Sequence, residues 1–317
     1  MEVVMSKENA EQIRLSVSIS PHIRGNVKTN NIMLDVLIAL APAFILSMLI
    51  FGARAALVVV VCVAACILSE AVFQKAMKKP VTVGDCSAAI TGVLLAFNLP
   101  VGIPIWQAVF GSLVAIILIK QLFGGLGKNF ANPAVTARIV MFLAFSVSMT
   151  TWTLPLDGVT GATPLALLAR GEVDSLPKLT DMLLGLRGGS LGETCALALL
   201  AGGIYLIIKR VITWHTPVVF IATVFAFTAA LGQDPVYHVL SGGLLLGAIF
   251  MATDYVTTPQ TSPGKLVFGV GAGLLTVVFR VYGSFPEGVS FAILLMNILT
   301  PFINKLTKNK PLGGVDQ

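Results

Sequence analysis

Long apolar blocks, separated by short polar connections, run from residue 32 to residue 304 of the chain. Because about 20 apolar residues form a helix that crosses a bilayer, this pattern predicts about ten transmembrane helices. The predicted segments are 32–51, 55–73, 85–99, 105–123, 133–150, 193–208, 216–232, 236–252, 264–279 and 288–304.

The third and eighth segments are short and interrupted by glycine and polar residues. The third lies between Asp85 and Pro100, and the eighth between Asp234 and Asp254. Gly-Val-Leu-Leu at 92–95 matches Gly-Gly-Leu-Leu at 242–245, and five segments in each half place the halves in opposite orientations. This indicates an all-α polytopic membrane protein with two inverted five-helix repeats, about 32–150 and 193–304, that contain broken helices. A chance match of common residues is the alternative.

Composition supports the membrane assignment. Of the 317 residues, 56% are hydrophobic and 11% are charged, and the mean hydropathy is +0.90. Soluble domains carry about 25% charged residues, so a water-soluble globular protein is excluded. The apolar content also excludes a disordered chain.

Basic residues orient the predicted helices. With both termini in the cytoplasm, 16 of the 21 Lys and Arg residues, Lys120 and Arg138 among them, fall on the cytoplasmic side, in accord with the positive-inside rule. The other five are Arg54, Arg170, Lys178, Arg187 and Arg280. We therefore predict a cytoplasmic segment 1–31, a membrane domain 32–304 with an extracytoplasmic loop at about 151–192, and a cytoplasmic tail 305–317. The net charge of +6 fits basic loops that face anionic lipid, so no nucleic-acid partner is predicted.

The cysteines and histidines are scattered and form no Cys-x-x-Cys pair, so we predict no metal site built by this chain alone. Cys62 and Cys66 share one helix face, where packing is the usual role of cysteine. The alternative is that the two cysteines act as ligands in a site shared with another subunit. The remaining cysteines are Cys86 and Cys195, and the histidines are His22, His215 and His238.

Five carboxylates lie in or beside the apolar segments. Asp35 and Glu70 are close to predicted helix ends. A structural contact or a contact with lipid headgroups is one candidate role there, and a position on an ion path is the other. For Asp85, Asp234 and Asp254, helix capping is the simplest role. Ion coupling or flavin contact is the alternative.

The loop at 151–192 contains Asp157-Gly-Val-Thr160-Gly161-Ala162-Thr163-Pro164. Spacing alone favours a surface turn, because its glycines and proline are turn residues. The segment also matches the pattern Asp-x-x-(Ser/Thr)-Gly-Ala-Thr, which resembles the site where flavin transferase attaches FMN. The resemblance implies a phosphodiester between FMN and the Thr163 hydroxyl, with Asp157, Thr160, Gly161 and Ala162 completing the motif.

The resemblance extends along nearly the whole chain. Matching segments are Ser20-Pro21-His22, Asp85 to Pro100, Gly124 to Pro133, Gly188 to Thr194 and Phe250 to Asp254. They resemble the D subunits of the Rnf complex, an ion-translocating ferredoxin:NAD oxidoreductase, and the related B subunits of the sodium-pumping NADH:quinone reductase. The absence of the longer N-terminal region of the latter favours the Rnf branch. Cys86 departs from the pattern, since a small residue such as Gly is expected there.

The resemblance implies a flavoprotein subunit that is not catalytic alone. It would carry electrons between ferredoxin and NAD, coupled to Na⁺ or H⁺ translocation, in a prokaryotic cytoplasmic (inner) membrane with FMN on the outer face. Electrons would arrive at this FMN from a neighbouring flavin subunit and cross inward. A second, non-covalent flavin, riboflavin, is implied in the membrane part. The implied partners are the other Rnf subunits, including the FMN-bearing G subunit, together with flavin transferase and membrane lipid. A secondary transporter or channel with inverted repeats is the alternative, although it would have no reason to carry the 157–163 motif.

Overall fold

The computed structural model describes residues 29–155, 159–193, 195–283 and 288–308, and the ordered elements in these ranges are helices. An isolated β-bridge joins Thr153 to Thr160. The first half contains α1 (Thr29–Phe51), α2 (Ala53–Ala76), η1 (Val83–Asp85), α3 (Ser87–Phe97), α4 (Ile105–Leu113) continued by the π-helix η2 (Val114–Gln121), α5 (Pro133–Ala144) and α6 (Ser146–Thr150). The connecting region contains α7 (Pro164–Arg170), η3 (Val173–Ser175), α8 (Leu179–Leu184) and η4 (Leu191–Glu193). The second half contains α9 (Ala196–Ile208), α10 (His215–Ala230), α11 (Pro235–Leu240), α12 (Leu244–Leu246), the π-helix η5 (Gly247–Met251), α13 (Ser262–Val281) and α14 (Val289–Leu306).

Each predicted apolar segment contains helix, which confirms the all-α prediction. Four helices in the described ranges are long and apolar enough to cross a membrane: α1, α2, α13 and α14. The other apolar segments form shorter helices, and the third and eighth are short, as predicted. The segment 133–150 is not continuous, because the helix ends before Phe145, whose ring packs edge-on against Trp106 and Phe110 with centroids 5.1 and 5.5 Å away.

Several helices begin with a capping side chain followed by proline. Asn132 accepts hydrogen bonds from the backbone N–H groups of Ala134 and Val135 at the start of α5. Asp234 and Thr261 cap α11 and α13 in the same way. A polar cap satisfies an N–H group that would otherwise lack a partner, and proline has no N–H to satisfy. These local signals set the helix starts inside a chain that is apolar almost throughout.

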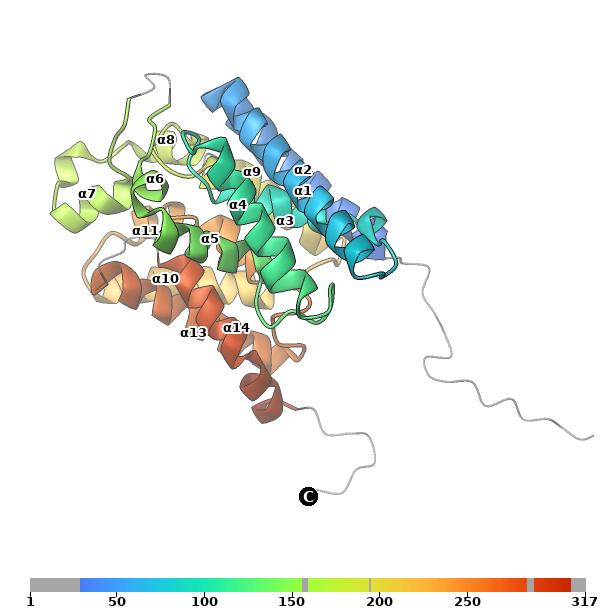
Figure 1. Ribbon diagram of the computed structural model, residues 1–317. Coiled ribbons are helices and arrows are strands. Elements are labelled where there is room, and N and C mark those ends of the chain that lie inside the picture. Colours follow the sequence, from blue (N-terminus) through green and yellow to red (C-terminus); the bar gives the residue numbers. More distant parts are fainter. Residues whose placement is uncertain (1–28, 156–158, 194, 284–287, 309–317) are drawn as a thin grey trace, which may run out of the picture.

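The helices form two groups joined by the connecting region (Figure 1). In the first group α2 packs on α3 and α4, and η2 packs on α5. In the second group α10 packs on α11 and α13, and α13 packs on α14. Contacts of α1 with α9 and of α5 with α14 join the groups.

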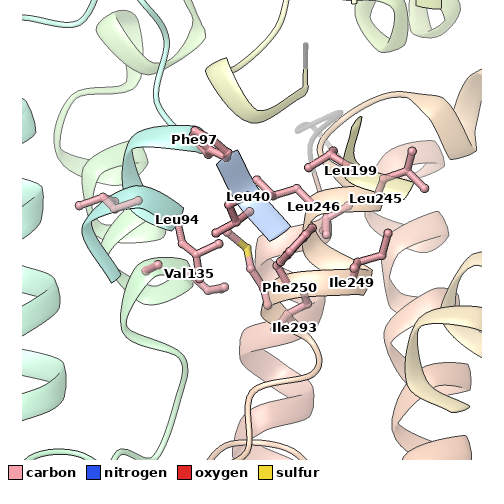
Figure 2. Packing of buried hydrophobic residues seen from close by; sticks show 14 of the residues in the cluster. Leu40, Leu94, Phe97, Val135, Leu199, Leu245, Leu246, Ile249, Phe250 and Ile293 are labelled. Atoms are coloured by element: carbon pink, nitrogen blue, oxygen red, sulfur yellow. The ribbon is translucent and has the colours of Figure 1, made fainter. Parts of the chain in front are cut away.

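The two short segments meet in the centre of the molecule (Figure 2). Leu94 and Phe97 of α3 pack in one cluster with Leu246 of α12 and Phe250 of η5. Asn98 and Asn132 donate hydrogen bonds across this centre to the sulfur and the carbonyl oxygen of Met251. The two halves therefore share a single apolar core.

Glycine permits a close helix contact within each half. A Cβ at Gly92 of α3 would lie 2.7 Å from Val63 Cα in α2, and one at Gly273 of α13 would lie 2.6 Å from Thr223 Cβ in α10. Both distances are below the separation of packed carbon atoms, so a side chain at either position would push two helices apart. Small residues at helix crossings are typical of membrane proteins, where close packing replaces the hydrophobic driving force.

Candidate functional site

A hairpin-like turn positions the motif residues. Leu154 N–H donates to the Val159 carbonyl at 2.8 Å, and Gly161 N–H donates to the Trp152 carbonyl at 3.0 Å. A Cβ at Gly161 would lie 2.7 Å from Leu154 Cδ1, so a larger residue at this position would displace the Leu154 side chain. Asp157 of the predicted motif lies outside the described residues.

Thr163 forms the start of α7. Its Oγ1 accepts a hydrogen bond from Ala166 N at 3.3 Å, and Pro164 occupies the first helical position. The residue is 5% exposed. The threonine that the motif singles out is therefore a helix cap held in one orientation and not a side chain on an open turn.

Thr163 lines a cavity of about 640 Å³. One wall is the α7 face, on which Thr163, Ala166 and Arg170 follow one another at helical spacing. A second wall is formed by α5 and α6, and a third by the start of α14. The lining residues are Arg138, Ile139, Phe142, Ser146, Thr150, Thr151, Trp152, Thr160, Gly161, Ala162, Thr163, Ala166, Arg170, Ser290 and Phe291.

The cavity has the size and composition of a ligand site, because such sites span about 300–1,000 Å³ and combine aromatic walls with a few polar groups. It brings together four of the five predicted site residues: Thr160, Gly161, Ala162 and Thr163. The role of these residues stays a prediction, and the structure fixes only their position.

Arg138 belongs to this cavity, which corrects the sequence-based prediction. The charge pattern assigned Arg138 to a cytoplasmic connection, but the residue lies inside α5 and is 6% exposed. Its Nη1 donates to Ser290 Oγ of α14 at 2.7 Å. The signal that was missed is its position five residues into an apolar segment, where a charge is costly and marks a functional group more often than a loop.

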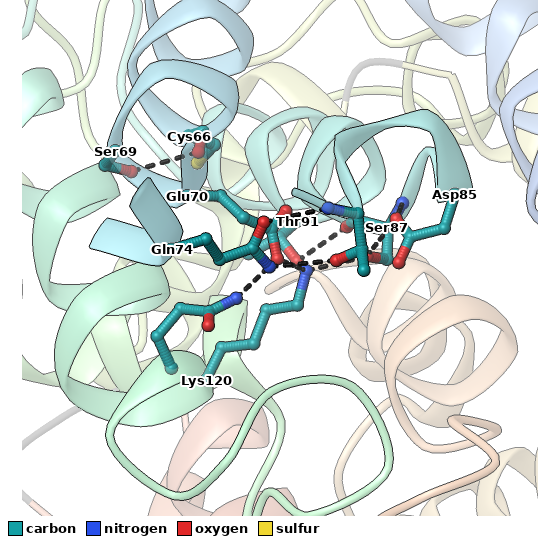
Figure 3. Close-up of polar contacts among 10 residues, drawn as sticks. Cys66, Ser69, Glu70, Gln74, Asp85, Ser87, Thr91 and Lys120 are labelled. Carbon is teal, nitrogen blue, oxygen red and sulfur yellow. Dashed lines mark hydrogen bonds and ion pairs between the residues drawn. The ribbon is translucent and has the colours of Figure 1, made fainter. Parts of the chain in front are cut away.

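A second buried cation, Lys120, was also assigned to the cytoplasmic edge and is 2% exposed (Figure 3). Its Nζ lies 2.7 Å from Glu70 Oε1 and donates to Ser87 Oγ at 2.6 Å. Gln121 donates to the same Glu70 oxygen at 2.6 Å, and Ser87 Oγ donates to Asp85 Oδ1 at 2.6 Å. Glu70, at 1% exposed, is thus a buried partner of Lys120 and does not reach the headgroups.

Of the other carboxylates, Asp234 has the predicted capping role, whereas Asp85 lies one residue before the cap position of α3 and still accepts from its first residue. Asp85 Oδ1 accepts from Ser87 N at 2.8 Å, and Asp234 Oδ1 accepts from Val236 N at 3.0 Å. Asp35, in contrast, joins two helices, because it accepts a hydrogen bond from the Tyr205 hydroxyl of α9 at 2.7 Å.

Asp254 caps no helix and instead closes a turn after η5. Its carboxylate accepts from Thr257 Oγ1 at 3.1 Å and from Val256 N at 3.4 Å. Burial raises the pKa of the Asp254 carboxyl, and these two hydrogen bonds lower it in part.

Two buried arginines hold the break between α11 and α12. Arg280 donates to the carbonyl oxygens of His238 and Ser241, the latter at 2.8 Å. Arg187 donates to Ser241 Oγ and to the Glu193 carbonyl, both at 3.0 Å. An interrupted membrane helix must satisfy its freed carbonyl groups within the protein, and these cations do so. Each is at most 6% exposed, and their predicted place on the outer side stays a prediction.

The helix that starts at Thr163 rests on this break. Leu165 of α7 is buried against Gly242, where an added Cβ would overlap its side chain. Gly242 and Gly243 have φ values of +65° and +66°, which glycine adopts without strain. The motif region is thereby fixed to the broken helix of the second half.

Cys62 and Cys66 are fully buried between α2 and its neighbours, which fits the packing role. Among the described residues, no group of three or more His, Cys, Asp or Glu side chains could hold a metal ion. Cys86 has a φ of +62°, a left-handed conformation that favours glycine, so the expectation of a small residue there has a backbone cause.

Comparison with known proteins identifies the family. Residues 16–313 match the model of the NQR2, RnfD, RnfE family. The chain belongs to this family. The match spans almost the whole sequence and confirms the resemblance inferred from the motifs.

Curated members of the family are similar over nearly their full length. The chain is 49% identical over 306 residues to the D subunit of the Na(+)-translocating ferredoxin:NAD(+) oxidoreductase complex of Acetobacterium woodii, covering 95% of this chain and 96% of that protein. It is 40% identical over 331 residues to the D subunit of the proton-translocating ferredoxin:NAD(+) oxidoreductase complex of Clostridium ljungdahlii, covering 98% and 99%. It is 39% identical over 332 residues to the D subunit of the ion-translocating oxidoreductase complex of Stutzerimonas stutzeri, covering 92% and 93%.

Proposed function

We propose that this chain is the membrane flavoprotein subunit of an ion-translocating ferredoxin:NAD oxidoreductase of the Rnf type, with FMN linked to Thr163. Family membership supports the complex, because the similar relatives carry the names of its D subunit. The observation that supports the flavin is the placement of Thr163 on the wall of a 640 Å³ cavity. The relatives' names describe oxidoreductase subunits, so a secondary transporter or channel is not proposed.

The residues of the cavity fit FMN. Phe142 and Phe291 line the cavity with aromatic rings that pack edge to face, with centroids 6.2 Å apart, and supply apolar surface for a flat heteroaromatic group. Two guanidinium groups, Arg138 and Arg170, lie on the walls, where a phosphate and the oxygens of a flavin ring require donors. The Thr163 hydroxyl is fixed on the wall by its cap hydrogen bond.

Attachment at Thr163 is an ester formation at phosphorus. The Oγ1 atom would bond to the flavin-bearing phosphorus of a flavin dinucleotide and lose its proton, while the P–O bond to the nucleoside monophosphate half breaks and that half leaves. When bound, FMN supplies electron transfer in one- or two-electron steps. The protein's part is to hold the group in place.

Replacement of Thr163 tests this assignment. In a host that expresses flavin transferase, Thr163→Ala should remove the covalent flavin fluorescence from the denatured band, because the variant has no hydroxyl. Thr163→Ser retains a hydroxyl and should retain fluorescence. Thr151→Ala, on the same cavity but outside the motif, is the matched control and should stay fluorescent. Persistent fluorescence in Thr163→Ala would sink the assignment.

We propose that the two helix groups are inverted five-helix repeats and that they provide ten crossings. Two observations support this architecture. In each group the helix of the second apolar segment packs on helices of the third and fourth segments: α2 on α3 and α4, and α10 on α11 and α13. The short helix of each group is preceded by a left-handed residue, Cys86 before α3 and Gly243 before α12. Such discontinuous helices are the usual elements of inverted-repeat membrane proteins.

The proposed orientation places both termini in the cytoplasm and the connecting region outside, in a prokaryotic inner membrane. The exposed Lys79 after α2 and Lys178 in the connecting region then lie on opposite faces. In a Cys86→Ser background, Lys178→Cys should react with an impermeant maleimide on intact cells, and Lys79→Cys only after permeabilisation. The reverse labelling pattern would invert the proposed topology.

We also propose riboflavin as a second, non-covalent flavin. The cleft between α3, α5 and the turn after η5 is the best-placed region. Asn129 and Asn132 line it, and Asn129 Oδ1 is buried without a hydrogen-bond partner. The cleft measures about 100 Å³, so binding would have to widen it. Denaturation of the purified chain should release one riboflavin while one FMN stays attached, and release of none would remove this part of the proposal.

The proposed partners are the other Rnf subunits, including the FMN-bearing G subunit, with flavin transferase needed for maturation. Electrons would arrive from a neighbouring flavin subunit at the outer face and pass inward. The coupling ion is Na⁺ or H⁺. Relatives at 49% and 40% identity carry names with different ions, so similarity does not select one.

A further inference from the structure

Arg138 is a buried part of the wall of the cavity that contains Thr163. It lies inside α5, about two turns before the break at Phe145, and it is 6% exposed. The guanidinium is therefore enclosed by the membrane domain.

A charged side chain buried in this way requires fixed partners. Ser290 Oγ of α14 accepts from Arg138 Nη1 at 2.7 Å, and this contact ties the guanidinium to a second wall of the cavity. Phe142, one helical turn further along α5, and Phe291, next to Ser290, also line the cavity. This part of the cavity thus combines two aromatic rings with one oriented cation.

The other arginine of the cavity is placed differently. Arg170 is at the last position of α7, and it is exposed. Solvent screens an exposed charge, whereas a buried one acts through a low dielectric. Substitution of either arginine by a neutral residue therefore removes one positive charge from the same cavity, buried in the case of Arg138 and exposed to solvent in the case of Arg170.

We propose that Arg138, oriented by Ser290, positions the isoalloxazine ring of the flavin linked to Thr163 and favours its reduction. The inference rests on the function proposed above and adds a positioning residue that the attachment motif does not contain. An oxidised flavin that takes up two electrons and one proton from solvent gains one negative charge, which resides on the pyrimidine part of the ring. A guanidinium N–H that faces this part forms a hydrogen bond that becomes charge-assisted on reduction.

Redox titration of the full-length chain, matured with flavin transferase and purified in detergent, tests the proposal. Dithionite with mediators would serve as the reductant, and flavin absorbance would be followed. In Arg138→Gln the equilibrium should shift at least tenfold toward the oxidised flavin, which is about 30 mV for a two-electron couple. Arg138→Lys should recover part of this shift, and Arg170→Gln should show a smaller one.

Fluorescence of the denatured band separates the two proposals. If Arg138→Gln is fluorescent and its potential is unchanged, the role of Arg138 is refuted while attachment at Thr163 stands. An equal shift in Arg170→Gln would also refute it, because the effect would then be one of net charge. If Arg138→Gln does not accumulate in the membrane, Ser290→Ala decides: a shift in the same direction supports the proposal, and an unchanged potential overturns it.

Discussion

Loss of one member of the buried Glu70–Lys120 pair should destabilise the protein strongly. The two charges are 2.7 Å apart, and each side chain is at most 2% exposed. Removal of one partner of a buried ion pair costs about 3–5 kcal/mol, since it leaves the other charge desolvated and unpaired. In Lys120→Met the Glu70 carboxylate keeps only the hydrogen bond from Gln121. With about 2–4 °C per kcal/mol for chains of a few hundred residues, the expected loss in Tm is of order 10 °C.

A double-mutant cycle isolates the pair from other effects of substitution. Glu70→Gln keeps the shape of the side chain and an oxygen that accepts from Gln121, so the double variant with Lys120→Met holds no unpaired charge. It should be more stable than Lys120→Met alone, with a coupling energy of about 2 kcal/mol or more. Lys79→Met, at an exposed lysine, is the control and should change stability by at most about 0.5 kcal/mol.

The buried cysteines make the assay convenient. Cys62, Cys66 and Cys195 are each at most 4% exposed. A thiol-reactive fluorophore in detergent therefore reports unfolding as these thiols become accessible. An unchanged Tm for Lys120→Met, or effects of the two substitutions that simply add, would refute the argument that the charges stabilise one another.

Two further substitutions follow from backbone geometry and burial. Cys86→Gly should raise Tm by a few degrees, because the left-handed φ of +62° costs a residue with a Cβ about 1 kcal/mol. Cys86→Ala keeps the Cβ and should leave Tm unchanged. A gain in Tm for Cys86→Ala would assign the effect to the thiol. The raised pKa of Asp254 means that the folded state binds its proton more tightly than the unfolded state does, so stability is lost as the pH rises through that pKa. Asp254→Asn should therefore raise Tm at pH 8 by more than at pH 5. Equal gains at both pH values would exclude ionisation as the cause.

Much of the fold could be predicted because the bilayer imposes a simple pattern on sequence. Apolar length located the helix-containing segments, and glycine with polar residues marked the short third and eighth segments. The break at Phe145 could not be predicted in this way. It depends on the packing of that ring against Trp106 and Phe110, which are 35 or more positions away in the sequence.

The burial of four cations could not be predicted from the charge pattern. Lys120, Arg138, Arg187 and Arg280 were assigned to membrane edges because lysine and arginine usually lie there. Each is instead buried and hydrogen-bonded by groups from another part of the chain. The motif at Thr163 could be found from local sequence, but its cavity could not, since α5 and α14 contribute walls that lie far from it in the sequence.

One helix links the cavity to the centre of the fold. At its first turn, α5 is tied to the broken helix of the second half, because its cap Asn132 donates to the Met251 carbonyl. Less than two turns later, Arg138 lines the cavity that contains Thr163. The opposite wall has its own link, since Leu165 of α7 is buried against Gly242 at the break. Two contacts from different walls therefore tie the cavity that contains Thr163 to the broken helix of the second half. A cavity on an independent surface loop would lack both contacts.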